Sequence, residues 1–335
     1  MLQNTWYAVG WSRDIDTQPK KLKLNNLDVL LVRNELKQVQ AFHAYCPHRG
    51  CDLSLGHFDG QLLTCPFHGW QFQQDGQCVN IPANRTQQFF PSASLLRTYT
   101  VIEKYGLVWV NLNQNAQIEN ESFNSFAELD VPEWVRVPFR KTWQAHFTRV
   151  VESVLDVSHL PFVHPETTGQ DANPVVNPLE VTYSKDGICI YPTPYVSTHP
   201  MEPPVEGAVQ GIGRTSTERT SIELKFPNQW MIRTPLGDGM WMMTFLAFTP
   251  IDEQATAIYG FVMRNFDHES EFLNLFHLEH TEFIMGQDQR IIESIRPYQA
   301  PFHLHQEVHV SSDTPTIRFR VMLREALKKE GTIHG

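Results

Sequence analysis

The chain has 335 residues, of which 41 % are hydrophobic and 19 % charged, a composition typical of a soluble globular protein long enough for two domains. A formal net charge of −10 argues against a nucleic-acid partner. No apolar run is long enough to cross a membrane, and the N-terminus lacks a basic segment followed by an apolar one, so we expect a cytoplasmic protein. The five cysteines are an odd number, which argues against a disulfide framework and favours metal ligation in a reducing compartment.

The first 115 residues indicate a small all-β domain. Residues 28–32, 39–43 and 107–112 are rich in β-branched and aromatic side chains and are predicted to be strands. The pairs Asp59-Gly60, Asp75-Gly76 and Tyr105-Gly106 lie between strand-like segments and predict tight turns. Residues 113–122 are rich in Asn, Gln and Glu and are typical of a linker, so we place the domain boundary between residues 115 and 116.

The second part of the chain, residues 116–335, indicates a domain that mixes helices and strands. Residues 142–163 carry a broad apolar face at helical spacing and predict a helix. Two long strands and two further helices are predicted, over residues 230–249, 256–264, 269–295 and 316–329. The last helix has Asp313 or Thr314 as its candidate N-cap, and its predicted apolar side comprises Ile317, Val321 and Ala326.

Two loops of the first domain each carry one cysteine and one histidine. Cys46 and His48 lie in Cys-Pro-His-Arg-Gly, and Cys65 and His68 lie in Cys-Pro-Phe-His-Gly-Trp. Two thiolates and two imidazoles suit a [2Fe–2S] cluster in which the cysteines hold one iron and the histidines the other. Structural zinc sites also use two cysteines and two histidines, but usually as a cysteine pair followed by a histidine pair. The mixed pairs therefore favour the iron–sulfur cluster over zinc.

A second group of possible metal ligands lies at the end of the predicted helix over residues 142–163 and directly after it. Asp156 and His159 are three residues apart, so on a helix they share a face. His159 and His164 are five residues apart, and Pro161 between them is expected to bend the helix so that both imidazoles reach one ion. Two core or capping histidines are the plainer alternative, and the Cys/His loops upstream favour the metal site.

Two histidines need a carboxylate to complete the facial triad that leaves positions open on Fe(II). Asp288 is the leading candidate, because it precedes the isoleucines within residues 291–295 at helical spacing and so falls on the predicted buried face. A buried carboxylate without a partner is costly, and a bound metal removes that cost. Glu282 and Glu293 are the alternatives, although Glu293 lies off the apolar side of the predicted helix.

Together these residues resemble the catalytic (alpha) subunit of a Rieske non-haem iron oxygenase. Besides the ligand sets, the resemblance covers Asn4-Thr-Trp-Tyr7, Tyr105-Gly-Leu-Val-Trp109 and Gly286-Gln-Asp288. The length and the N-terminal pattern are most similar to the branch that includes vanillate O-demethylase and dicamba monooxygenase. The resemblance implies an α+β protein, with an all-β Rieske domain over residues 1–115 followed by a helix-grip, START-like catalytic domain with an antiparallel sheet over residues 116–335.

The resemblance also implies roles for the individual residues. Cys46, His48, Cys65 and His68 would hold the Rieske [2Fe–2S] cluster, and His159, His164 and Asp288 would hold a mononuclear Fe(II). The family forms head-to-tail homotrimers, in which catalytic Asp156 would bridge His159 to the cluster histidine His68 of the neighbouring subunit. Many relatives have Asn at the position of Ser153, a difference that leaves the ligands intact.

The function that the resemblance implies is that of a terminal oxygenase component. Such a monooxygenase takes electrons from NAD(P)H through a separate flavin and iron–sulfur reductase, and uses O₂ to hydroxylate or O-demethylate a small aromatic substrate. The reductase must be a separate protein, since the sequence has no dinucleotide-binding fingerprint and no further cysteine cluster. The alternative is a Rieske electron carrier or ligand-binding protein without oxygenase turnover, against which the second ligand set argues.

The substrate-binding residues are less well defined by the sequence. Large apolar side chains on the predicted strands could form a pocket wall, namely Trp230, Met231, Met240, Trp241, Met242 and Phe245. Residues 166–178 could form a lid, and Arg233 and Arg264 are the nearest cations that could bind a carboxylate. The remaining cysteines of the first domain, Cys51 and Cys78, are predicted to be buried, small and apolar.

Overall fold

The computed structural model describes residues 1–84, 90–113, 123–167, 174–176, 178–192 and 219–332. The chain forms two compact units: an N-terminal unit of Met1–Phe123 with Thr249–Asp252, and a C-terminal unit of Asn124–Phe248 with Glu253–Gly335. The predicted boundary and nearly all of the predicted linker lie outside the described residues. Of the helices that are described, none combines the length and the apolarity that crossing a membrane requires.

A six-stranded sheet in the order β1-β10-β9-β4-β3-β2 forms the body of the N-terminal unit. Its strands are β1 (Trp6–Trp11), β2 (Lys20–Leu24), β3 (Leu27–Arg33), β4 (Val39–His43), β9 (Thr98–Lys104) and β10 (Leu107–Asn111). Alternate side chains such as Val29, Leu31, Val108 and Val110 fill one core, as the period of two along a strand requires. The strands predicted over residues 28–32, 39–43 and 107–112 are confirmed.

A smaller four-stranded sheet has the order β5-β6-β7-β8; the first Cys/His loop lies between β4 and β5, and the second joins β6 to β7. Its strands are β5 (His57–Phe58), β6 (Leu63–Thr64), β7 (Gln71–Phe72) and β8 (Cys78–Asn80). The predicted turns after β5 and after β7 are confirmed, and in each of them the aspartate side chain accepts a backbone N–H two residues further on. Asp59 accepts from Gln61 at 2.8 Å and Asp75 from Gln77 at 2.9 Å.

The C-terminal unit is built on a seven-stranded antiparallel sheet in the order β11-β17-β16-β15-β14-β13-β12. Its strands are β11 (Val135–Trp143), β12 (Glu180–Tyr183), β13 (Gly187–Tyr191), β14 (Ser221–Lys225), β15 (Gln229–Gly237), β16 (Met240–Pro250) and β17 (Thr256–Arg264). The first and last of these in the chain, β11 and β17, pair along their whole length. With helices packed on this sheet, the predicted α+β class is confirmed.

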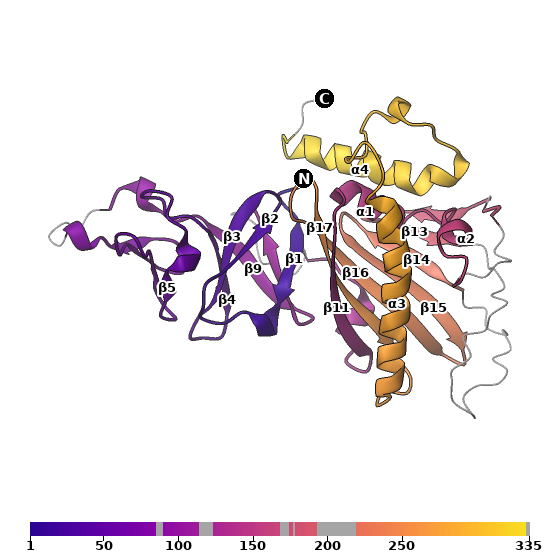
Figure 1. Ribbon diagram of the computed structural model, residues 1–335, viewed down its shortest axis with the longest axis horizontal. Helices are drawn as coiled ribbons and strands as arrows, with labels where there is room; N and C mark the ends of the chain where they lie inside the picture. The colour runs from indigo at the N-terminus through magenta and orange to yellow at the C-terminus, as the bar shows by residue number, and fades with distance from the viewer. Residues whose placement is uncertain (85–89, 114–122, 168–173, 177, 193–218, 333–335) are drawn as a thin grey trace. The chain divides into compact units, whose positions relative to one another are not determined.

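Four α-helices accompany this sheet: α1 (Phe147–Ser153), α2 (Leu160–Val163), α3 (Glu271–Ile292) and α4 (Thr314–Lys329). Figure 1 shows the long helix α3 running across one face of the sheet, where it packs on β11 and β17. Its buried side chains His277, Thr281 and Met285 recur every four residues, which is the spacing of one helical face. Both α1 and α2 contact α3, and these contacts bring the segment after α1 close to the C-terminal part of α3.

The single helix predicted over residues 142–163 is wrong. Strand β11 continues to Trp143, α1 ends at Ser153, and α2 begins only at Leu160. Val150, Val151, Leu155 and Val157 are all buried, but they do not belong to one helix. Their apolar pattern reflects burial of the whole segment, which helical periodicity alone cannot distinguish from one continuous amphipathic helix.

Two further predictions about elements need correction. The strand predicted over residues 230–249 is a hairpin of β15 and β16, which turns at Asp238-Gly239 with positive φ angles of 50° and 73°. Helix α4 begins near the predicted N-cap, but Asp313 makes no side-chain capping bond. The buried side of α4 comprises Pro315, Phe319, Met322, Leu323 and Leu327, and not the predicted Ile317, Val321 and Ala326, which are only partly buried.

We expect Gly76→Ala to destabilise the N-terminal unit far more than Gly106→Ala. Both glycines have positive φ, which costs an alanine about 1–2 kcal/mol. At Gly76 a Cβ would also lie 1.9 Å from the carbonyl oxygen of Leu96, whereas at Gly106 it would meet nothing within 4 Å. The overlap adds about 1–3 kcal/mol for Gly76→Ala. Urea unfolding followed by circular dichroism measures both losses, and equal losses would contradict the turn geometry.

Candidate metal centres

The two Cys/His loops have the same backbone construction. In the first, the N–H of Gly50 donates to the carbonyl of Cys46 at 2.9 Å. In the second, the N–H of Gly69 donates to the carbonyl of Cys65 at 3.0 Å. Each loop is thus a closed turn of five residues that begins at its cysteine, with His48 at the third position of the first turn and His68 at the fourth position of the second. Two equivalent turns facing one another are suited to holding a group between them.

The side chains of the four predicted cluster ligands converge. Cys46 and Cys65 are buried, His48 is half-buried and His68 is exposed, and the two imidazole rings lie 4.6 Å apart at their centroids. Nδ1 of His48 is a buried ring nitrogen without a hydrogen-bond partner. Burial raises the pKa of the Cys46 thiol to about 12, a cost that an iron cation bound to the thiolate removes. The donor set and the unpaired nitrogen both fit a cluster with two Cys and two His ligands.

Trp70 lies directly against this site. Its indole ring stacks on the His48 imidazole with centroids 4.5 Å apart and planes 6° from parallel, so it fixes the orientation of that ring and covers it. The predicted burial is confirmed for Cys78, whereas Cys51 is only half-buried.

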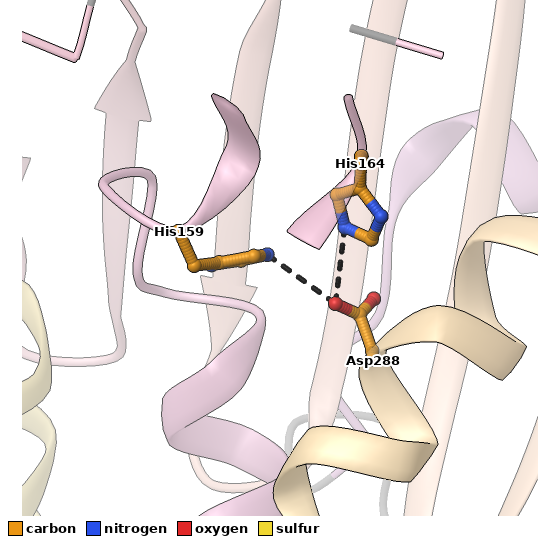
Figure 2. Close-up of side chains that lie close together, drawn as sticks. All are labelled: His159, His164 and Asp288. Carbon is orange, nitrogen blue, oxygen red and sulfur yellow. Dashed lines mark ion pairs between the residues drawn. The ribbon is translucent and has the colours of Figure 1, made fainter. Parts of the chain in front are cut away.

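Among the described residues, His159, His164 and Asp288 form the one group of three or more possible ligands whose ligand atoms all lie within 4.8 Å of one another. Figure 2 shows both imidazoles pointing at the same carboxylate oxygen. Oδ1 of Asp288 is 3.3 Å from Nε2 of His159 and 3.0 Å from Nε2 of His164. Ligands at right angles on a metal with bonds of about 2.1 Å stand about 3.0 Å apart, so the group fits one side of an octahedral ion.

The short helix α2 sets the spacing of the two histidines. His159 is its N-cap residue and His164 its C-cap residue, so the whole helix lies between them. Pro161 sits in the first turn of α2, where its missing N–H costs nothing. The prediction that both imidazoles reach one place is confirmed, but its reason was wrong: Pro161 starts a helix and does not bend one. The shared helical face predicted for Asp156 and His159 is also wrong, because Asp156 lies between α1 and α2.

Asp288 projects from α3 toward the histidines. Its side chain is 17 % exposed, and it continues the buried face of α3 at three residues after Met285. The isoleucine face used to predict this burial is wrong, since Ile291 is itself exposed. The alternative ligands are engaged elsewhere. Glu282 pairs with Lys141 at 2.9 Å, and Glu293 accepts the backbone N–H of Gln144 at 2.8 Å.

The Asp288 carboxylate and the His164 imidazole shift each other's pKa values. Burial pushes the pKa of Asp288 upward, but the hydrogen bonds and charges of His159 and His164 outweigh this and hold it below its usual range. Burial likewise pushes the pKa of His164 downward, and the Asp288 carboxylate more than reverses the effect, so that the pKa is raised. A site that stabilises an ionised carboxylate next to two imidazoles provides the ligand charges that a divalent iron needs.

Sequence reasoning missed Gln287. Its Oε1 lies 2.8 Å from Nδ1 of His164, the ring nitrogen that faces away from Asp288. The only available signal was its position next to Asp288 in the chain. Residues that hydrogen-bond to the second ring nitrogen of a ligand histidine have no sequence motif of their own.

The side chain of Asp156 bonds to its neighbour Ser158. Its Oδ1 accepts from the backbone N–H of Ser158 at 2.7 Å and from the Ser158 hydroxyl at 2.6 Å, which forms a turn just before α2. Within the described part of the chain it makes no hydrogen bond or ion pair with His159. The hydroxyl of Ser153 donates to the carbonyl of Val150 within α1, at 2.9 Å.

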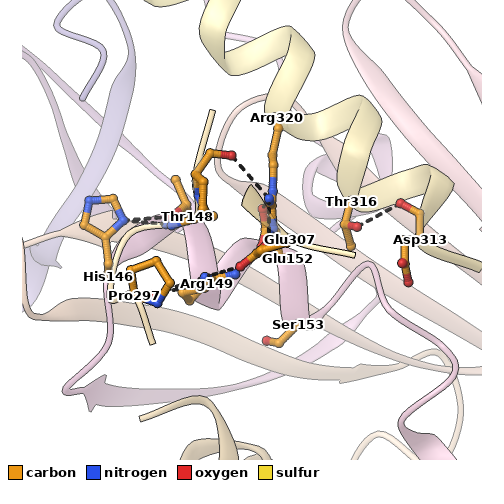
Figure 3. A network of polar contacts seen from close by, with 12 residues as sticks. His146, Thr148, Arg149, Glu152, Ser153, Pro297, Glu307, Asp313, Thr316 and Arg320 are labelled. Atoms are coloured by element: carbon orange, nitrogen blue, oxygen red, sulfur yellow. Dashed lines mark hydrogen bonds and ion pairs between the residues drawn. The ribbon is translucent and has the colours of Figure 1, made fainter. Parts of the chain in front are cut away.

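A buried network of four charges anchors α1, the helix that precedes the histidines (Figure 3). Arg320 of α4 pairs with both carboxylate oxygens of Glu152 in α1, and also with Glu307 at 2.7 Å. Arg149 pairs with Glu307 at 2.7 Å and lies 3.4 Å from Glu152. Two guanidinium and two carboxylate groups balance, and this is the condition under which buried charges are tolerated. The network ties α1 to α4 by directional contacts.

The candidate substrate residues are largely occupied within the fold. Arg233 pairs with Glu128 and with Glu223, and the buried guanidinium of Arg264 donates to Asn274 at 2.6 Å and to backbone carbonyls. Of the predicted apolar wall, Trp230, Met231 and Phe245 are buried, whereas Met240, Trp241 and Met242 are partly exposed. Most of the predicted lid, residues 168–173 and 177, lies outside the described residues.

Two family models match the sequence. The Rieske [2Fe-2S] domain matches residues 5–100, and the vanillate O-demethylase oxygenase C-terminal domain matches residues 143–329, which is more than half of the chain. The first range contains both Cys/His loops, and the second contains α2 and α3 with the histidine and aspartate group.

Similar curated proteins include oxygenase components and a demethylase. Methylxanthine N1-demethylase NdmA of Pseudomonas putida is 26 % identical over 348 residues, covering 99 % of this chain and 91 % of that protein. The toluene-4-sulfonate monooxygenase iron-sulfur subunit TsaM1 of Comamonas testosteroni is 31 % identical over 179 residues, 53 % of this chain. In that alignment the chain spans about half, 51 %, of the relative's length.

Solved structures share the fold. NdmA superposes with a TM-score of 0.79 at 22 % identity, covering 98 % of this chain and 92 % of its own. Dicamba monooxygenase bound to dicamba superposes with a TM-score of 0.77 at 18 % identity, covering 99 % of each chain. The chain therefore belongs to the Rieske oxygenase family, as a Rieske [2Fe–2S] domain joined to an oxygenase domain of the vanillate O-demethylase type, with a Rieske cluster and a mononuclear iron as its cofactors.

Proposed function

We propose that the chain is the terminal oxygenase component of a Rieske monooxygenase. It uses O₂ and electrons that a separate flavin and iron–sulfur reductase takes from NAD(P)H, and it hydroxylates or demethylates a small aromatic substrate. The observation that carries this proposal is the convergence of His159, His164 and Asp288 in a chain that also holds two Cys/His loops. An electron carrier would need only the loops, and the second ligand group therefore favours an oxygenase over the carrier.

Residue roles follow from the chemistry of the donors. We assign Cys46 and Cys65 to one iron of the cluster, His48 and His68 to the other, and His159, His164 and Asp288 to the mononuclear iron. When bound, this last iron supplies the open positions at which O₂ is activated. We further propose that residues 1–115 form the Rieske domain and residues 116–335 the catalytic domain. Since none of the five cysteines is in a disulfide, we propose a cytoplasmic, reducing environment.

The three side chains of the mononuclear site have different roles. His164 is 1 % exposed, which gives the site a fixed and water-free side. Asp288 keeps its charge and orients the Nε2 atoms of both histidines. His159 is 21 % exposed in its side chain and forms the open side of the site, which substrate and the second subunit can approach.

The second subunit is the source of the electron in this proposal. His68, which we assign to the cluster, is exposed, and Asp156, three residues before His159 in the sequence, is half-exposed. A carboxylate that accepts hydrogen bonds from two metal-bound imidazoles orients both of them. We propose that Asp156 bridges His159 to His68 of the neighbouring subunit, in a head-to-tail homotrimer that closes by threefold rotation.

The charges of the catalytic domain favour an uncharged substrate. Arg233 and Arg264 were the predicted partners of a substrate carboxylate, and both are neutralised or hydrogen-bonded within the fold. A neutral aromatic ring bearing an O- or N-methyl group suits such a site better than an aromatic acid does. The similarity to a methylxanthine N1-demethylase over nearly the whole chain supports the same substrate class.

The test of this function is formaldehyde release that depends on NADH and O₂, measured with a surrogate reductase and methylated aromatic substrates. We expect His159→Ala to reduce turnover by more than about 100-fold because it removes a ligand. Its visible cluster spectrum should be unchanged, and the iron content should fall from three to two per two labile sulfides. His268→Ala, at an exposed histidine of the same unit, serves as the matched control. Loss of the cluster spectrum in His159→Ala would contradict the assignment of this residue.

We expect Asp156→Asn to retain both metals and yet slow the oxidation of the reduced cluster by O₂ and substrate by more than about 10-fold in a single turnover. The amide oxygen of Asn still accepts the two bonds from Ser158, so the turn before α2 is preserved. Ser158→Ala is the control, since it weakens the turn without removing the charge. An unchanged single-turnover rate in Asp156→Asn would refute the bridging role.

A further inference from the structure

Two consecutive residues of α3 hold both ring nitrogens of His164. Asp288 Oδ1 lies 3.0 Å from Nε2, and Gln287 Oε1 lies 2.8 Å from Nδ1 (Figure 2 shows the Asp288 contact). The backbone of His164 is also fixed, because its N–H donates to the carbonyl of Leu160 at 3.1 Å. A planar ring held at both nitrogens and at its backbone has one orientation available to it.

The amide oxygen determines which nitrogen of His164 carries the proton. An amide Oε1 can only accept a hydrogen bond, so the partner that faces it must be Nδ1–H. A metal ion at the proposed position would take the lone pair of Nε2, the atom that faces Asp288, and the proton left on the neutral ring would be the one on Nδ1. Gln287 is placed to accept a hydrogen bond from that N–H, so its amide oxygen supports the tautomer that a metal ligand requires.

His159 has no comparable support. Within the described residues, the interaction of its ring nitrogens is with Asp288 alone, at 3.3 Å, and its side chain is 21 % exposed against 2 % for His164. The two histidine ligands are thus unequal. His164 is held rigidly from behind by Gln287, and His159 is left free to adjust.

We propose that Gln287 is a positioning residue that fixes the tautomer and ring plane of His164 and so sets the metal affinity of the second site. This inference rests on the proposed function, in which His164 is an iron ligand. The choice of a neutral acceptor matters as well. A carboxylate at this position would draw the Nδ1 proton and make the imidazole a stronger donor, which favours the ferric over the ferrous ion, whereas an amide leaves the site suited to Fe(II).

The test is a metal titration of the full chain with its cluster in place and the mononuclear site emptied by a chelator. Co²⁺ affinity is measured by competition with a chromophoric chelator, and cluster absorbance reports that each variant is folded. We expect Gln287→Met, which keeps the shape but loses the acceptor, to bind Co²⁺ about 10- to 100-fold more weakly. Gln287→Glu keeps the acceptor and is expected to bind at least as tightly as the wild type.

Gln289→Met provides the matched control on the same helix. The amide of Gln289 donates to Glu293 at 2.6 Å and to the carbonyl of Thr142 at 3.5 Å, so we expect wild-type affinity. The inference would be overturned if the wild type and Gln287→Met bound Co²⁺ with equal affinity. It would also be overturned if Gln287→Glu, or the Gln289→Met control, lost as much Co²⁺ affinity as Gln287→Met does. If the wild type itself binds no Co²⁺ beyond its cluster, the proposed function fails instead, so the two failures are distinguishable.

Discussion

The catalytic unit depends on one interaction, the contact of the Asp288 carboxylate with two imidazole nitrogens. A half-buried carboxylate is unfavourable unless it is paired, and the two histidines keep its pKa low. Helix α3 carries this carboxylate and α2 carries the histidines at its two ends, so the same contact joins the long helix of the unit to the segment between α1 and α2. With an iron bound, the three side chains would share one ion in place of their direct contact, which requires little movement of either helix.

The charge network around Arg320 supports that segment from the other side. Both carboxylate oxygens of Glu152 accept from Arg320, while its own backbone carbonyl accepts the N–H of Asp156 at 3.1 Å. One residue thus connects α4 to the turn that holds the proposed bridging carboxylate. Because removing one partner of a buried ion pair costs about 3–5 kcal/mol, this position tolerates little movement. The C-terminal helix is therefore part of the scaffold of the metal site.

The sequence predicted correctly those features that are specified by residues close together in the chain. The Asp-Gly turns were predicted because two adjacent residues suffice to specify them, and the Cys/His loops because their ligands fall within five residues. Asp288 lies beside the two histidines, as predicted, but the reason for the prediction was wrong, since the buried face of α3 follows Met285 and not the isoleucines after it. The bond between Gln287 and His164 joins residues 123 positions apart, and no local pattern encodes such a pair.

Both metal sites have one embedded side and one open side. At the loops, Cys46 and Cys65 are buried while His68 is exposed, and on α2, His164 is buried while His159 is partly exposed. The embedded ligands fix geometry, because packed side chains cannot turn without opening a cavity. The open ligands are histidines, whose second ring nitrogen can donate a hydrogen bond to a further acceptor while the first binds metal. In the homotrimer that we propose, an electron that crosses between two subunits would leave and enter through these open histidines, which is why we place the bridging carboxylate between them.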